Sequence, residues 1–245
     1  MTRPGIDRFF GLVLTLLTPV ILVLGSVRLI MSPAFLTFEY QRAGFPADVY
    51  GLTTDDRLRW GPLGIEYLLT DAGIDLLADL RFTNGAALFT PRELEHMEDV
   101  KAVTRIAFAV LAGVIAAAAA AGAALIVRRR RDVLLASLAH GGLLVLGLIG
   151  AVVVSAVVAW DAFFTLFHRT FFADGTWIFL TSDTLIRLYP EQFWFDCALV
   201  VGALTIGGAL LLIATNWRYS RSHAGRGDGR GEPSASEALR VGQVD

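Results

Sequence analysis

The chain has 245 residues, of which 55% are hydrophobic and 18% are charged, and its mean hydropathy is +0.58. Soluble domains average about 45–50% apolar and about 25% charged residues, so this composition excludes a soluble enzyme and a disordered protein. The formal net charge is −2, and the one cysteine, Cys197, excludes an intramolecular disulfide. The composition predicts a polytopic membrane protein.

Four runs are long and apolar enough to cross about 30 Å of hydrocarbon as helices, which takes roughly 20 residues each. None of them alternates like a membrane barrel strand, so an α-helical bundle is the spanning structure that satisfies the backbone. The first run follows Arg3 and Arg8 as a signal peptide would, but its apolar core is too long and no A-x-A site follows, so we interpret it as an uncleaved anchor. The predicted transmembrane helices are residues 9–30, 101–127, 133–160 and 195–215.

Arginines indicate the orientation, because cytoplasmic segments of membrane proteins are enriched in Arg and Lys. They precede the first helix, fill the link Arg128–Arg131 and follow the fourth helix, and four crossings place these regions on one side. We therefore expect both termini in the cytoplasm. The cytoplasmic segments are residues 1–8, the link 128–132 and a disordered tail, 216–245, and the extracytoplasmic loops are residues 31–100 and 161–194.

The first outer loop carries apolar residues at helical spacing between Gly61 and Leu80, which predicts short helices over the mouth of the bundle. Thr90, Pro91 and Glu93 form a capping box with proline in the first turn. This pattern predicts a helix that begins there and continues into the second span.

That helix places His96 on an exposed turn just above the outer membrane surface. Asp99 lies three residues further along, on the same face. A carboxylate in that position would orient the imidazole and raise its basicity. His96 is therefore a candidate catalytic base.

The second outer loop is unusually aromatic between residues 163 and 195, and such rings favour the headgroup level of a membrane. Asp174 and Gly175 are typical of a turn, so we expect an interfacial hairpin. The loop contains His168, with Asp161 seven residues earlier on the same face of a continuing helix. Composition alone favours a belt that seats the protein in the membrane over a binding pocket. The expected fold is an all-α polytopic membrane protein with four transmembrane helices, a helical outer-face cap and an aromatic interfacial loop.

Other interpretations of the polar residues stay open at this point. His96, His168 and Asp99 would suit a three-ligand zinc centre, although no H-E-x-x-H spacing supports it. Arg28, at the outer end of the first span, either snorkels to the interface or binds an anionic headgroup. The run Ala139–Gly142 indicates close helix packing around a neutral histidine.

Two stretches resemble signatures of the Lit family, the bacterial lipoprotein intramolecular transacylases. The first is Leu88–Lys101, which resembles the pattern F-x-x-x-E-x-x-H-M-x-D-V-K. The four-span layout with its long first outer loop is similar along nearly the whole chain except the tail. The second signature is looser in spacing and comprises Phe167-His168, Phe171-Phe172, Gly175–Phe179, Asp183, Leu185-Ile186 and Pro190-Glu191.

The resemblance implies an acyltransferase of the bacterial cytoplasmic membrane with its active site at the outer face. It would move the sn-2 acyl chain of a diacylglyceryl-cysteine lipoprotein to the α-amine of that cysteine. The implied partners are the lipoprotein N-terminus and membrane lipids, with no nucleic acid and no cofactor. The essential histidines of the family correspond to His96 and His168. Our hypothesis makes His96 the base and His168 the oxyanion donor or general acid, with exchangeable roles, and the expected supporting residues are Asp99, Asp161, Arg169, Trp177 and Asp183.

Two other functions stay open from the sequence. One is a non-catalytic, lipid-binding accessory membrane protein, and the other is acyl transfer or hydrolysis on another lipid. The paired histidines argue against the accessory protein, because an aromatic loop alone would serve to seat it in the membrane.

Overall fold

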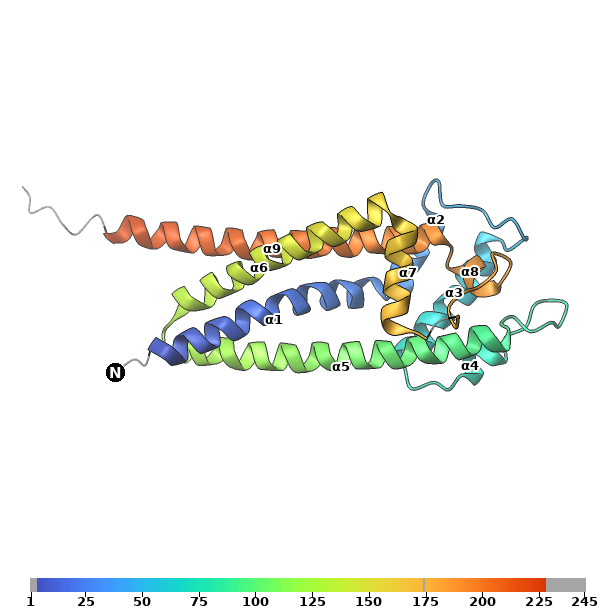
Figure 1. The fold of residues 1–245 in the computed structure, drawn as a ribbon, viewed down its shortest axis with the longest axis horizontal. Helices are drawn as coiled ribbons and strands as arrows, with labels where there is room; N and C mark the ends of the chain where they lie inside the picture. Colours follow the sequence, from blue (N-terminus) through green and yellow to red (C-terminus); the bar gives the residue numbers. More distant parts are fainter. Residues whose placement is uncertain (1–3, 174, 228–245) are drawn as a thin grey trace, which may run out of the picture.

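The structure is a computed structural model that describes residues 4–173 and 175–227. Four long helices form a bundle, and shorter ones gather at one of its ends, here called the capped end (Figure 1). The opposite end, called the arginine end, holds the link between the second and third long helices. Within the described residues the helices are α1 (Pro4–Ile30), α2 (Pro33–Gln41), α3 (Thr54–Leu69), α4 (Asp75–Ala78), α5 (Pro91–Val127), α6 (Arg131–Val158), α7 (Trp160–Phe171), α8 (Thr184–Leu188) and α9 (Glu191–Gly227).

In the described part of the chain, four helices are apolar and long enough to cross a membrane, namely α1, α5, α6 and α9. The predicted all-α class with four membrane helices is therefore confirmed. The first turns of α5, residues 91–105, precede its apolar segment, residues 106–127, and extend the helix into the capped end.

Glycines of α6 bring the bundle helices into close contact. A Cβ on Gly141 would lie 2.5 Å from the Cβ of Thr18 in α1, and one on Gly142 would lie 3.0 Å from the carbonyl oxygen of Ala209 in α9. No larger residue fits either place without a shift of the helices, so the predicted close packing is present. His140 itself is exposed and takes no part in it.

Asp7, in the first turn of α1, is buried at the arginine end. Its Oδ1 accepts a hydrogen bond from Nε of Arg128 at 2.5 Å, and its Oδ2 accepts one from Nη1 of Arg130 at 3.0 Å. A buried carboxylate is stable only with such partners. The pairs fasten the N-terminal helix to the link between α5 and α6.

The start of the predicted tail is corrected by the structure, because α9 continues through Gly227. Side chains four residues apart support the added turns: the guanidinium of Arg221 lies 3.8 Å from the centroid of Trp217, and the rings of Tyr219 and His223 are 4.1 Å apart. The rest of that tail, residues 228–245, lies outside the described residues.

Two tyrosine hydroxyls fasten the cap together. Oη of Tyr40 in α2 donates to the carbonyl of Leu188 in α8 at 2.7 Å, and Oη of Tyr189 donates to the carbonyl of Gly61 in α3 at 2.5 Å. Gly64 permits this approach, because a Cβ there would lie 2.3 Å from the Tyr189 hydroxyl. The predicted short helices over the mouth are thus present, as α3 and α4, around a buried apolar core that includes Leu36, Trp60, Leu77, Leu88 and Leu188.

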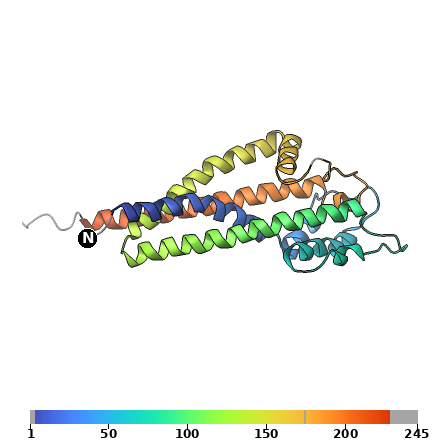
Figure 2. The same cartoon turned by 60° about the horizontal axis from the view of Figure 1, so that its bottom comes forward.

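Helix α7 runs across the bundle axis (Figure 1), after a break at Ala159 with φ of −144° and ψ of 61°. Figure 2 shows that α6 diverges from α5 toward the capped end, and α7 with the loop behind it returns the chain toward α5. The segment predicted as a hairpin is therefore a transverse helix followed by a loop. Gly175 in that loop has φ of 88°, and Asp174 of the predicted turn lies outside the described residues.

Candidate active site

The two candidate histidines meet at the capped end, although they come from different elements. His96 lies in the extension of α5, and His168 lies near the end of α7. Their ring centroids are 6.5 Å apart, and the ring planes differ by only 23°.

The position of His96 follows from the way α5 begins. The hydroxyl of Thr90 accepts from the backbone N–H of Glu93 at 3.3 Å, and Oε2 of Glu93 accepts from the N–H of Thr90 at 2.7 Å, which is the predicted capping box. Glu93 is fully buried, and its Oε1 accepts from the backbone N–H of Leu185 at 2.7 Å. One carboxylate therefore joins the start of α5 to α8, and His96 lies one turn beyond it.

The tautomer of His168 follows from its hydrogen bond. Its Nδ1 lies 2.8 Å from the carbonyl oxygen of Phe164, one turn earlier in α7. A carbonyl only accepts, so Nδ1 of the neutral ring carries the proton and Nε2 presents a free lone pair. This arrangement is that of a proton acceptor held in a fixed direction.

An aromatic box, defined as Phe164, Phe172, Trp177 and Phe179, surrounds the two imidazoles. Phe172 lies beside both of them, with its centroid 5.1 Å from that of His96 and 5.7 Å from that of His168. Phe179 lies 5.2 Å from His96, while Phe164 and Trp177 lie 4.0 Å and 4.9 Å from His168. The box buries His96 and leaves His168 half-buried, which limits the access of water to both rings.

Other aromatic residues of the same segment fit the predicted belt. Phe167 and Phe171 are about half exposed, and Leu166, which precedes Phe167, is 68% exposed. Helix α7 thus has one face toward the surroundings and another toward the histidines. The sequence posed belt and pocket as alternatives, and in the structure some aromatic side chains of this segment are exposed while others surround the histidines.

Two polar atoms of this site have no partner within the described residues. They are Nδ1 of His96 and Nε1 of Trp177, and both are buried. Leaving a buried polar group unpaired costs about 1–3 kcal/mol. Two such atoms around one pair of imidazoles indicate a site prepared for a polar group of a ligand.

Burial keeps both imidazoles neutral. Desolvation lowers the pKa of His96 to about 4, and the neighbouring His168 lowers it as well, while Asp99 opposes the shift. Burial also lowers the pKa of His168, against the effect of its hydrogen bond to Phe164. Both groups lie outside the apolar spans, and near pH 7 both are neutral donors and acceptors rather than cations.

The surroundings of His96 differ from the prediction. The sequence placed it on an exposed turn with a basicity raised by Asp99, but its side chain is buried, its Nδ1 bonds to no carboxylate, and its pKa is lowered. The reason is tertiary, because the loop after α7 places Phe172 and Phe179 on that face of α5.

Among the other predicted site residues, Trp177 packs against His168, and the rest are not part of the aromatic box. Asp183 precedes α8, where its Oδ2 accepts from the N–H of Leu180 at 2.8 Å and from Nη2 of Arg92 at 3.0 Å. Asp161 and Arg169 lie on exposed parts of α7. Asp183 thus shapes the loop that covers the site.

Sequence reasoning missed Arg92 and the phenylalanines of the aromatic box as members of the site. The guanidinium of Arg92 lies 5.1 Å from the centroid of Phe179 and pairs with Asp183, which holds the loop over His96. Phe164 and Phe172 stand four residues before and after His168, and this spacing was available in the sequence. Phe179 gave no such signal, because it lies in an irregular loop.

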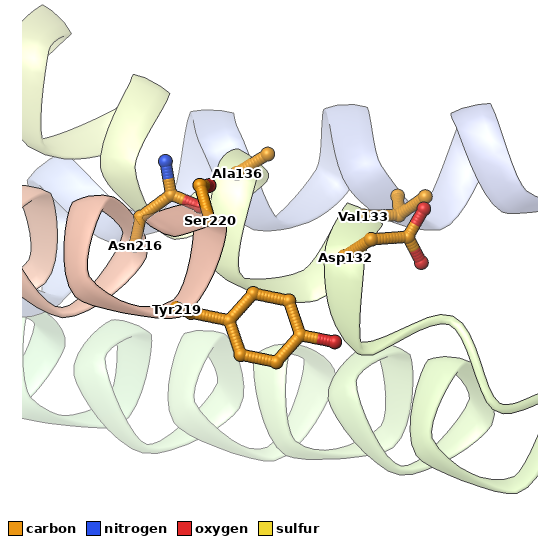
Figure 3. Close-up of a pocket in the computed structure, with 6 residues that line it drawn as sticks. All are labelled: Asp132, Val133, Ala136, Asn216, Tyr219 and Ser220. Carbon is orange, nitrogen blue, oxygen red and sulfur yellow. The ribbon is translucent and has the colours of Figure 1, made fainter. Parts of the chain in front are cut away.

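The geometry does not support the zinc centre that the sequence left open. In the part of the chain that the structure describes, no three His, Cys, Asp or Glu side chains are grouped to hold a metal ion, so the zinc centre is not assembled there. A cavity of about 350 Å³ lies at the arginine end, and neither histidine contributes to its lining. It is lined by Asp132, Val133, Ala136, Asn216, Tyr219 and Ser220 (Figure 3).

Comparisons with known proteins agree with this architecture. The family described as "Lipoprotein intramolecular transacylase Lit" matches residues 12–194. A protein of Aquifex aeolicus (strain VF5), named only as uncharacterized, is 33% identical over 220 residues, which cover 90% of this chain and 99% of that protein. The lipoprotein intramolecular transacylase Lit from Bacillus cereus superposes with a TM-score of 0.75 at 23% identity, over 91% of this chain and 99% of its own. A variant of that protein with a histidine replaced by arginine superposes with a TM-score of 0.70, at 22% identity over 91% of this chain and 95% of its own.

Proposed function

The chain belongs to the Lit family of lipoprotein intramolecular transacylases, and from that premise we propose which acyl chain it moves and how. The substrate is a lipoprotein whose N-terminal cysteine carries a diacylglyceryl group. The sn-2 acyl chain moves from glycerol to the α-amine of the same cysteine. The product is an N-acyl, lyso-glyceryl lipoprotein.

One observation supports this reaction most directly. Two neutral imidazoles and an indole N–H meet in one largely apolar box, and two of their nitrogens have no partner within the described residues. Acyl transfer requires a proton acceptor for the amine and N–H donors for the oxyanion, and this box contains both kinds of group.

The bond changes are those of aminolysis of an ester. The amine nitrogen attacks the ester carbonyl carbon, a C–N bond forms, and the C–O bond to glycerol breaks. The proton lost by the amine finishes on the glycerol oxygen. The enzyme needs no serine or cysteine nucleophile, because the substrate supplies the amine.

The hydrogen bonds favour His168 as the base. Its Nδ1–H is held by Phe164, so Nε2 accepts the proton of the attacking amine and then delivers it to glycerol. His96, whose pKa is lowered to about 4, is the weaker base. Its imidazole N–H and the indole N–H of Trp177 serve as donors for the developing oxyanion.

This assignment exchanges the roles expected from sequence, where His96 was the base. The change rests on the hydrogen-bond partners, which differ between the two rings. His168 has an acceptor that fixes its tautomer, whereas Nδ1 of His96 has no partner in the described structure.

Much of the rate enhancement comes from the fact that the reaction is intramolecular. Ester and amine belong to one molecule, so holding them in a reactive geometry contributes roughly 7–11 kcal/mol. The arginines predict that both termini lie in the cytoplasm and that the capped end therefore lies at the outer face of the bacterial membrane. In this orientation the acyl chains and the N-terminus of the lipoprotein reach the aromatic box from the same interface.

The test is mass spectrometry of the N-terminal lipopeptide of a model lipoprotein, coexpressed with this protein in a host that lacks N-acylation. We expect the N-acyl lyso form with the wild type and its loss in His96→Ala and His168→Ala. His140→Ala is the matched control, because His140 is an exposed histidine of α6 that is not part of the aromatic box.

An unchanged diacylglyceryl form, with the wild type folded in the membrane, would contradict the proposal. It would leave acyl transfer on another lipid or a non-catalytic lipid-binding role. Full product formation by both alanine variants would contradict the histidine mechanism.

A further inference from the structure

A second site lies at the capped end, between α1, α5 and the end of α3. It is a cavity of about 270 Å³ whose lining includes no residue of the aromatic box and neither candidate histidine. Its apolar lining is Leu68, Leu69 and Phe108, and its charged lining is Arg28, Asp71 and Arg105. An apolar floor below two arginines is the arrangement expected for an amphipathic ligand with an anionic head.

Arg28 is available to such a ligand. Its guanidinium lies 5.8 Å from the centroid of Phe108, and it has no carboxylate partner among the residues that the structure describes. A guanidinium fork without a carboxylate suits the bidentate binding of a phosphate.

Arg105 is only weakly engaged. Its Nη2 lies 2.7 Å from Oδ1 of Asp71, but the two side chains are 54% and 103% exposed. Exposed pairs of this kind contribute little stability, so replacing the carboxylate by a phosphate costs little free energy. Asp71 is the one carboxylate in the lining, which leaves a positive excess.

The depth of the two arginines points to a lipid. Arg28 directly follows the apolar run of α1, and Arg105 directly precedes that of α5, on neighbouring helices that pack together. Both therefore lie at the boundary of the hydrocarbon, where lipid phosphates lie. Leu29 and Ile106 beside them are 69% and 66% exposed, as expected for side chains that contact acyl chains.

We propose that this cavity binds the phosphate of an anionic phospholipid through Arg28 and Arg105, with the lipid chains along α1 and α5. The site is separate from the acyl-transfer site and does not depend on the proposed reaction.

Native mass spectrometry of the purified full chain tests this directly. The added ligands are phosphatidylglycerol, phosphatidylcholine and inorganic phosphate, each titrated separately. We expect the wild type to bind phosphatidylglycerol about tenfold more tightly than phosphatidylcholine, and the Arg28→Gln/Arg105→Gln variant to lose that preference. Arg59→Gln is the matched control, because Arg59 is also exposed and also lies over an aromatic ring, that of Trp60.

An undiminished preference for phosphatidylglycerol in the double variant would overturn the proposal. Displacement of phosphatidylglycerol by an equal concentration of inorganic phosphate would also overturn it, because the ligand would then be free phosphate. If the double variant fails to fold, Arg28→Gln alone decides, since loss of one of the two guanidinium forks should reduce the lipid preference while Arg59→Gln leaves it unchanged. An equal loss of the preference in folded Arg28→Gln and in Arg59→Gln would mean that no specific site exists.

Discussion

The rings of His96 and His168 lie nearly parallel 6.5 Å apart, but their nitrogens are bound differently. Nδ1 of His168 donates to a backbone carbonyl, whereas Nδ1 of His96 is buried without a partner in the described chain. The pair is therefore chemically asymmetric although the two residues are the same. That asymmetry has consequences for mutation and for pH.

Glutamine substitutions should separate the roles of the two histidines. A glutamine side chain donates a hydrogen bond but cannot act as a base. We expect His168→Gln to lower kcat by about 10²–10⁴-fold, and His96→Gln to retain more activity than His96→Ala. Single-turnover kinetics on a synthetic diacylglyceryl lipopeptide measures both. The opposite order would assign the base to His96.

Trp177→Phe should remove a donor and leave the packing largely intact. The phenyl ring still fills the box, while loss of the unpaired Nε1–H lowers kcat by about 10²–10³-fold. Thermal stability should stay equal or rise, because a buried unsatisfied group is removed. Trp217→Phe, at an exposed residue of α9, is the control. Unchanged kcat in Trp177→Phe would remove Trp177 from the mechanism.

The acid limb of kcat/KM should lie below pH 6.5. The free enzyme needs a neutral histidine base, and burial lowers the pKa of both His96 and His168. Activity therefore persists as the pH falls through the ordinary histidine range and declines only below it. A pH–rate profile on the lipopeptide checks this, and a limb above pH 7 would show that neither ring is the buried base described here.

Stability should decrease as the pH falls from about 6.5 toward 4. In that window an unfolded histidine binds a proton, while folded His96, with a pKa of about 4, does not. The unfolded state binds more protons, so the free energy of unfolding falls by about 3 kcal/mol across the window. Thermal unfolding in detergent at several pH values measures the slope. His96→Phe should flatten it, and an equal slope in that variant would contradict the assignment.

Glu93→Ala should destabilise the capped end. The carboxylate accepts from the backbone N–H groups of Thr90 and Leu185, and its loss leaves the part-buried N–H of Thr90 and the buried N–H of Leu185 without this acceptor. We expect a loss of about 2–4 kcal/mol in the free energy of unfolding, measured by denaturant unfolding in micelles. Glu95→Ala, two residues away and exposed, should change stability by less than about 0.5 kcal/mol. Similar values for the two variants would exclude this role of Glu93.

Local sequence patterns determined the membrane fold and much of its framework. Long apolar runs require helices in a membrane, and the capping box at Thr90 and Glu93 marked the first turn of α5 because its hydrogen bonds lie within four residues. Gly141 and Gly142 predicted close helix packing, because a residue without a side chain lets two helices approach and can be recognised in the sequence alone.

Only the tertiary structure decided the chemical state of the site. The helical pattern of α5 left His96 exposed beside Asp99, but the loop that follows α7, far along the chain, covers it with Phe172 and Phe179. Burial then lowers the pKa of His96, and Arg92 and Asp183 hold the covering loop through a contact that no local pattern encodes. Residue identities determined which groups are present, whereas long-range packing determined their solvation, and solvation sets their pKa values.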